Sequence, residues 1–300
     1  MTPSIRYRRA KPSDVQAGWE AVRRDWPLIP ESARPTAPTV MSELLAEGRL
    51  FLVVFENAVT RTIVNMGCYM FPRPEFLRRA MTAEGRGIVE QILESEDRNQ
   101  RVLLNWREVA QANASEAVEL LSCLSTPDFD SPYCLAEIGA IIEAFSFFVR
   151  GYNFRAVWQE NGCPRAVTPL VEMGYRTIRR VERQCGDVVS LQHLSIADAH
   201  PGSYVASILQ APQPRFGFTP REQALLELAL LDWPDSEAAG WLEVTTDAVK
   251  KRWRAIYAKV RALEPGLFDG LRGGPSACRH AVLSRIRHNP QELRPRHKIP

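Results

Sequence analysis

The sequence of 300 residues contains no run of about 18 apolar residues, the length that a helix needs to cross a lipid bilayer. Its first residues, MTPSIRYRRAKPSD, also lack the apolar stretch of a secretory signal peptide. We therefore expect a cytoplasmic protein that makes no membrane contact.

The sequence also lacks paired cysteine motifs. No CxxC pair and no Cys/His spacing typical of a zinc site is present, so we expect free, mostly buried thiols, no metal site and no cofactor. Three of the five histidines lie near the C-terminus without an acidic residue or a cysteine at ligand spacing. The six cysteines are Cys68, Cys123, Cys134, Cys163, Cys185 and Cys278.

Positive charge is concentrated at one end of the chain. Residues 1–200 hold 23 Lys/Arg against 25 Asp/Glu, and residues 201–249 hold 2 against 7. Residues 250–300 hold 13 against 3. This end is therefore a candidate surface for a polyanion, with a solvated Arg-rich tail as the alternative.

The first 190 residues alternate between strand-like and helix-like patterns. Such alternation predicts an α/β layer structure, so we place an α/β sensor or dimerisation domain over residues 1–190 and a linker over 191–215. The strand-like segments are residues 49–55, 62–71 and 152–160, and the helix-like segments are residues 135–149 and 166–173.

Three short helices are predicted after the linker. Thr219-Pro220-Arg221-Glu222 is a capping box with proline at the first helical position, and Pro234 should end the helix that it begins. Asp235 or Ser236 is expected to cap a second helix of two turns. Thr245 or Thr246 is expected to cap a third, which runs to about Val260.

The third helix is amphipathic. Val249, Trp253, Ile256 and Val260 recur at helical spacing and predict its buried side. Cationic side chains fall on its other faces. In a helix that enters the major groove, residues at the N-terminal end are closest to base edges, and Lys and Arg further along neutralise phosphates. The candidate DNA-binding residues are Thr245, Thr246, Asp247, Lys250, Lys251, Arg252, Arg254 and Lys259.

The 43 residues from Phe218 to Val260 resemble the LuxR-type helix-turn-helix family over their whole length. Asp232, Glu243 and Ala248 depart from the family pattern. The resemblance implies an all-α DNA-binding domain over residues 216–263, followed by a basic C-terminal extension over 264–300. It also implies double-stranded DNA as partner and a homodimer. The alternatives are a mere packing module and the fourth region of a sigma factor.

The segment from Gly151 to Arg176 resembles the later part of the Gcn5-like (GNAT) acetyltransferase fold. A strand is followed by Asn161, a short helix and Gly174-Tyr175. Between residues 100 and 150, however, glycine occurs only at Gly139. The resemblance implies an acetyl-CoA loop rich in glycine, and this sequence lacks one, so we expect no catalysis.

Two further groups of side chains have a plain structural interpretation. Glu137 and Glu160 are possible general bases, but surface or helix-cap carboxylates are the simpler interpretation. An aromatic group has the residue types of a ligand pocket, although such residues more often form the core. The aromatic group consists of Trp106, Trp158, Phe145, Phe147, Phe148 and Tyr152.

These patterns together predict a sequence-specific transcription regulator without catalytic residues. Its N-terminal domain, GNAT-like or a similar sensor layout, would sense a small-molecule ligand, bind a protein partner or dimerise. The alternative is a GNAT-like acyltransferase fused to a helical DNA-binding module. A third possibility is an adaptor that binds protein partners only.

Overall fold

The computed structural model describes residues 5–22, 28–29, 31, 33–124, 134–182, 188–195, 198–199, 208–209, 211–272 and 274–295. The chain forms two compact units. The first comprises Met1–Phe148 and Phe154–Leu209, and the second comprises Val149–Asn153 and Gln210–Pro300. Cys185 and much of the predicted linker, residues 196–197, 200–207 and 210, lie outside the described residues. The predicted domain limits stay predictions.

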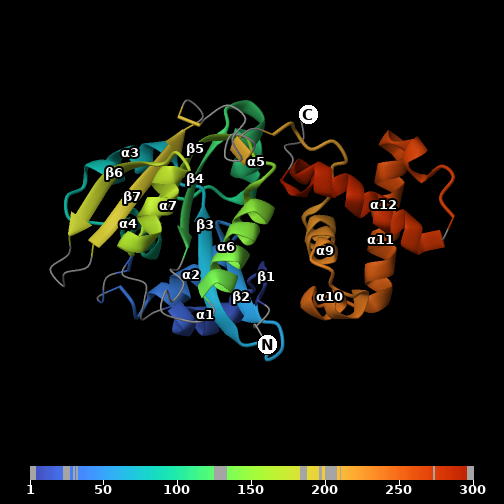
Figure 1. The fold of residues 1–300 in the computed structure, drawn as a ribbon, viewed down its shortest axis with the longest axis horizontal. Coiled ribbons are helices and arrows are strands. Elements are labelled where there is room, and N and C mark those ends of the chain that lie inside the picture. The colour runs from blue at the N-terminus through green and yellow to red at the C-terminus, as the bar shows by residue number, and fades with distance from the viewer. Residues whose placement is uncertain are drawn as a thin grey trace. The chain divides into compact units, whose positions relative to one another are not determined.

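A seven-stranded sheet organises the first unit, with strand order β1-β2-β3-β4-β5-β7-β6. The pair β4–β5 is parallel and the other neighbours are antiparallel (Figure 1). This mixed sheet with flanking helices confirms the α/β prediction. Its strands are β1 (Ile5–Arg9), β2 (Leu50–Asn57), β3 (Ile63–Met70), β4 (Val118–Leu124), β5 (Phe154–Asn161), β6 (Arg176–Glu182) and β7 (Val188–Ser195).

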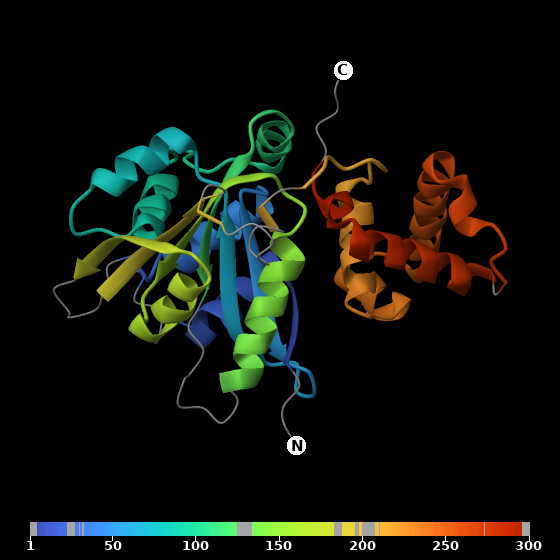
Figure 2. The ribbon, with the colours of Figure 1, turned by 45° about the horizontal axis from the view of Figure 1, so that its top comes forward.

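Helices pack on both faces of this sheet (Figure 2). The main hydrophobic core joins one face to side chains of α1, α2, α3 and α4, and α6 packs its aromatic residues against the other face. The helical elements of this part of the chain are η1 (Pro12–Asp14), α1 (Val15–Val22), α2 (Ala37–Ala46), α3 (Pro74–Thr82), α4 (Ile88–Asp97), α5 (Trp106–Ser115), α6 (Cys134–Val149) and α7 (Pro164–Glu172).

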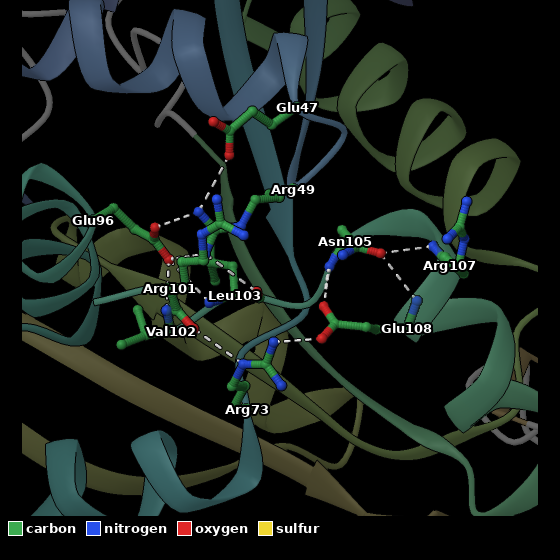
Figure 3. Close-up of polar contacts among 10 residues, drawn as sticks. All are labelled: Glu47, Arg49, Arg73, Glu96, Arg101, Val102, Leu103, Asn105, Arg107 and Glu108. Carbon is green, nitrogen blue, oxygen red and sulfur yellow. Dashed lines mark hydrogen bonds and ion pairs between the residues drawn. The ribbon is translucent and has the colours of Figure 1, made fainter. Parts of the chain in front are cut away.

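Three of these helices, α3 to α5, lie between β3 and β4 in the sequence. A buried ion pair links the middle one, α4, to the residue before β2. The Glu96 carboxylate of α4 pairs with Arg49, which directly precedes β2, at 2.6 Å (Figure 3). Its Oε1 also accepts hydrogen bonds from the amides of Val102 and Leu103, at 2.7 and 3.0 Å. Both charges are buried and partnered, so this network holds the inserted helices and is not a reactive site.

A second contact in the same region fixes the start of α5. Asn105 accepts from the amides of Arg107 and Glu108, and Glu108 accepts in return from the Asn105 amide at 2.9 Å. Arg73, at the N-cap of α3, pairs with the same Glu108 (Figure 3). The guanidinium and the Asn105 amide hold the pKa of Glu108 below its ordinary value, against the opposing effect of burial. The capping box therefore also links α3 to α5.

We predict that Glu96→Ala lowers the free energy of unfolding by about 3 to 5 kcal/mol, because it leaves the Arg49 charge buried without its main partner. Chemical denaturation followed by circular dichroism measures this loss. Glu47→Ala is the matched control, because Glu47 also pairs with Arg49 but is half exposed. A loss for Glu96→Ala no larger than that of the control would contradict the assignment.

The described residues of the second unit contain helices and no strand. The predicted capping box is present: the Thr219 hydroxyl accepts from the Glu222 amide at 3.3 Å, and the Thr219 amide donates to Glu222 at 2.6 Å. One cap was predicted wrongly, because Pro234 rather than Asp235 or Ser236 occupies the N-cap of α10. The elements are α9 (Pro220–Leu230), α10 (Asp235–Trp241), α11 (Thr246–Leu263), η2 (Pro265–Phe268), α12 (Gly274–His288) and η3 (Pro290–Leu293).

A fully buried arginine joins three parts of this second unit. Arg294 pairs with Glu227 of α9 at 3.4 Å, and its Nε donates to the Arg150 carbonyl at 2.7 Å. Its guanidinium lies 5.3 Å from the centre of the Tyr152 ring. Gly151 has a φ of +99°, and a Cβ there would lie 2.6 Å from the Gln291 amide nitrogen. The loop after α6 therefore packs tightly on the segment around Arg294.

We predict that Arg294→Ala lowers the free energy of unfolding of the second unit by about 3 to 5 kcal/mol, because Glu227 stays buried without its partner. Arg287→Ala is the control: its ion pair with Asp232 is exposed and should contribute about 0 to 1 kcal/mol. Thermal unfolding of both variants checks this, and equal shifts in Tm would contradict it.

Candidate functional site

The two parallel strands at the middle of the sheet, β4 and β5, stop pairing with each other before either strand ends. The ladder between β4 and β5 begins at Val118 and Phe154, has an irregularity after Val118, and ends at Ser122 and Gln159. Beyond that point β4 still pairs with β3 as far as Leu124, and β5 still pairs with β7 as far as Asn161. The last two residues of each strand therefore lie beyond the β4–β5 ladder, at what we call the β4–β5 opening.

A row of polar side chains crosses the sheet at the last paired position. Tyr69 is the register partner of Ser122, Ser122 of Gln159, and Gln159 of Gln192. Register partners in adjacent strands point to the same face, so these four side chains share one side of the sheet. All four are buried, although polar residues are uncommon in the middle of a sheet. We call them the polar row.

Asn161 extends this group at the end of β5. Its Nδ2 donates to Gln192 Oε1 at 2.6 Å, and its Oδ1 accepts from Gln159 Nε2 at 3.2 Å. Alternation along β5 places Asn161 on the same face as Gln159. Asn161 thus continues the polar row into the β4–β5 opening.

Three atoms of the polar row have no hydrogen-bond partner among the described residues. They are the hydroxyls of Tyr69 and Ser122 and the Nε2 of Gln192. Burial raises the pKa of Tyr69 well above its ordinary value, so its hydroxyl stays protonated and is available as a donor. Buried polar groups without partners are unfavourable, and a bound ligand that accepts hydrogen bonds would remove this cost.

Aromatic side chains of α6 cover the polar row. The Phe145 ring lies 6.0 Å from that of Tyr69, and the Phe148 ring lies 5.0 Å from that of Phe51. Of the aromatic group predicted from the sequence, Trp106 also contacts Phe51, and Phe147 contacts Phe148. Trp158 and Tyr152 do not join this group, since Trp158 packs against His193 and Tyr152 lies beneath Arg294. The six aromatic residues therefore do not line one pocket.

The two carboxylates considered as general bases lie at helix N-termini. Glu160 is buried, and its Oε1 and Oε2 accept from the amides of Ile88 and Val89 at 2.6 and 2.9 Å. It therefore caps α4 from the end of β5 and stabilises the positive end of that helix. Glu137 lies in the first turn of α6. Glu160 is therefore a helix cap, and the position of Glu137 in a first turn agrees with the same simpler interpretation.

A titratable cluster lies on the face of the sheet opposite to the polar row. The Trp158 indole donates to Glu119 at 2.8 Å, and its ring lies 4.1 Å from that of its register partner His193. Burial lowers the pKa of His193 below 6.5, although Asp198 and Glu119 oppose this effect. The imidazole is therefore neutral near pH 7 and can accept a proton.

We predict that an NMR titration will find His193 with a pKa below 6.5. Because the unfolded chain then binds a proton more readily than the folded one, His193 makes folding less favourable as the pH falls below about 6.5. His193→Gln should remove that part of the pH dependence. A measured pKa at or above 6.5 would contradict the burial argument.

The candidate DNA-binding residues lie together on α11 and its N-cap. The Thr245 hydroxyl accepts from the Ala248 amide at 3.2 Å, and Lys250 pairs with Asp247 at 3.3 Å. Lys259 donates to Glu222 at 2.6 Å and to the Gly217 carbonyl at 3.0 Å, so its charge is already partnered. Contact of these residues with DNA, like homodimerisation, stays a prediction. Thr246, Lys251 and Arg254 are exposed, and Arg252 is half-buried.

The described residues contain no group of three or more His, Cys, Asp or Glu side chains placed to hold a metal ion. Among the same residues, no helix combines the length and the apolar character needed to cross a membrane.

Sequence comparisons find no protein-family model and no curated protein that matches this chain. Solved structures do match. They include a mosquito arylalkylamine N-acetyltransferase-like 5b, with 12% identity over 64% of this chain and 100% of that one and a TM-score of 0.38. FeeM, an N-acyl amino acid synthase from uncultured soil microbes, matches with 11% identity over 68% and 98% and a TM-score of 0.40. NAA60 of Arabidopsis thaliana, in complex with acetyl-CoA, matches with 13% identity over 65% and 99% and a TM-score of 0.37.

These findings agree with the resemblance to the GNAT fold that the segment from Gly151 to Arg176 suggests. They support a GNAT-like α/β layout over the N-terminal two thirds of the chain. They correct the main prediction. Of the neighbours named above, one is described as similar to an N-acetyltransferase, one as an N-acyl amino acid synthase and one as a complex with acetyl-CoA. No finding supports a LuxR-type transcription regulator. The predictions of a regulator and of a protein without enzymatic activity are therefore wrong.

Proposed function

We propose that the first unit is an N-acyltransferase, which moves an acyl group from a thioester to an amine. The observation that carries this proposal is the β4–β5 opening with the polar row beside it. This was the alternative that the sequence left open beside the regulator.

The strand ends beyond the β4–β5 ladder suit an extended ligand that carries amide groups. Such a ligand can take the place of the missing ladder, as an added strand does at a sheet edge. The arm of a pantetheine thioester contains two amides in an extended chain. It would therefore find main-chain partners on both β4 and β5.

The polar row supplies donors for the reacting carbonyl. In the transfer the amine nitrogen attacks the thioester carbonyl, the C–N bond forms, the C–S bond breaks, and the proton lost by nitrogen ends on the departing sulfur. Negative charge develops on the carbonyl oxygen during the attack. The protonated Tyr69 hydroxyl and the Ser122 hydroxyl have no hydrogen-bond partner in the part of the chain that the structure describes, and both are suited to donate to that oxygen.

We predict that Tyr69→Phe lowers kcat by about 100-fold, the usual loss when a donor to a developing oxyanion is removed, with KM little changed. The assay incubates the full chain with octanoyl thioesters of pantetheine and coenzyme A and a panel of amines. It detects the released thiol by colour and the amide by mass spectrometry.

Tyr7→Phe is the matched control, because Tyr7 also packs against α6 through Phe147 and Phe148. It should leave kcat within about threefold, a change of less than 1 kcal/mol in the barrier. Absence of amide formation with every thioester would contradict the proposed function. Equal losses in the two variants would contradict the role of Tyr69.

A further inference from the structure

We infer that the transferred acyl group carries a neutral oxygen atom, such as that of a ketone, which accepts a hydrogen bond from Gln192. This inference rests on the proposed function and names the class of acyl group that the same site takes. Gln192 belongs to the polar row, and the proposed reaction leaves its side chain unused.

A chain of side-chain amides fixes which atom of Gln192 is free. Gln159 donates its Nε2 to Asn161 Oδ1, and Asn161 donates its Nδ2 to Gln192 Oε1. The oxygen of Gln192 is therefore engaged, and its Nε2 has no hydrogen-bond partner among the described residues. An amide nitrogen only donates, so a ligand that completes this chain must bring an acceptor.

The side chain of Gln192 is also fully buried, with an exposed fraction of 0%. It lies within β7, which pairs with β5 on one side and with β6 on the other. Leu194 lies on the same face of β7, and a Cβ at Gly174, just after α7, would lie 3.7 Å from it. A buried donor without an acceptor is costly, so this site favours a substrate that supplies one.

The position of Gln192 separates it from the reacting carbonyl. Ser122, Gln159 and Gln192 are successive register partners on β4, β5 and β7. Adjacent strands lie about 4.8 Å apart, so the backbone of Gln192 is about 10 Å from that of Ser122. With the thioester oxygen at the Ser122 hydroxyl, Gln192 meets a part of the acyl chain that lies several bonds further on.

The acceptor is neutral, because the side chains of the polar row carry no charge. A carboxylate at Gln192 would be buried without a cation, which is far more costly than burying a ketone oxygen. On the edge strand β6, Arg180 shares this face as the register partner of Ser190, but it is exposed. These features favour an oxygen on the acyl chain over the carboxylate of an amino-acid substrate.

The test measures thiol release and amide formation by the full chain with octanoyl, 3-oxooctanoyl and 5-oxooctanoyl thioesters of pantetheine and coenzyme A. We expect at least one of the oxo thioesters to have a kcat/KM about 10- to 100-fold above that of the octanoyl thioester. An octanoyl thioester used as well as both oxo forms would overturn the inference and leave the proposed function standing. If no thioester yields an amide, the proposed function fails.

Gln192→Met removes the amide donor and keeps the length of the side chain. The ratio of kcat/KM between the preferred oxo thioester and the octanoyl thioester should fall by about tenfold or more. This ratio does not depend on the fraction of protein that is folded, and comparison with the unmodified chain cancels the intrinsic reactivity of the thioesters.

Thr177→Val is the matched control, because Thr177 is the register partner of Gln192 on β6 and is exposed. It should keep the ratio of the unmodified chain. An unchanged ratio in Gln192→Met, or an equal fall in Thr177→Val, would contradict the role of Gln192.

Discussion

The ladder between the parallel strands β4 and β5 ends at Ser122 and Gln159, while each strand continues with a different neighbour. A strand end beyond a ladder is where an extended ligand can add main-chain hydrogen bonds, and the β4–β5 opening offers two such ends. The polar row lies beside this opening, and three of its atoms lack partners among the described residues.

The surrounding structure holds this opening from both faces. On one face Glu160, at the end of β5, binds the first amides of α4, and the Arg49–Glu96 pair fastens the other end of that helix. On the other face α6 packs phenylalanines over the polar row. The inserted helices and α6 thus position the strand ends, while the strands themselves carry the groups suited to acyl transfer.

Much of this fold follows from local patterns in the sequence. Apolar periodicity located β2, β3, β5, α6 and α7 within a few residues, and the capping box at Thr219 marked the start of α9 correctly. The strands β4, β6 and β7 and the helices α2 to α5 were not predicted. The polar row was missed because it depends on register. Ser122, Gln159 and Gln192 lie on three strands far apart in sequence, and only the pairing of those strands brings them together. The available signal was the presence of Ser and Gln inside otherwise apolar strands. The prediction of a regulator rests on the cationic face of α11, a local pattern in the second unit that carries no information about the opening in the first.

The central claim is that an acyl-pantetheine arm completes the ladder between β4 and β5. Hydrogen exchange measured by NMR with and without saturating S-octyl pantetheine tests it most directly. The account predicts slower exchange at those amides of residues 122–124 and 159–161 that point into the opening and not toward β3 or β7. Binding that leaves these amides unchanged and protects another part of the chain would contradict it.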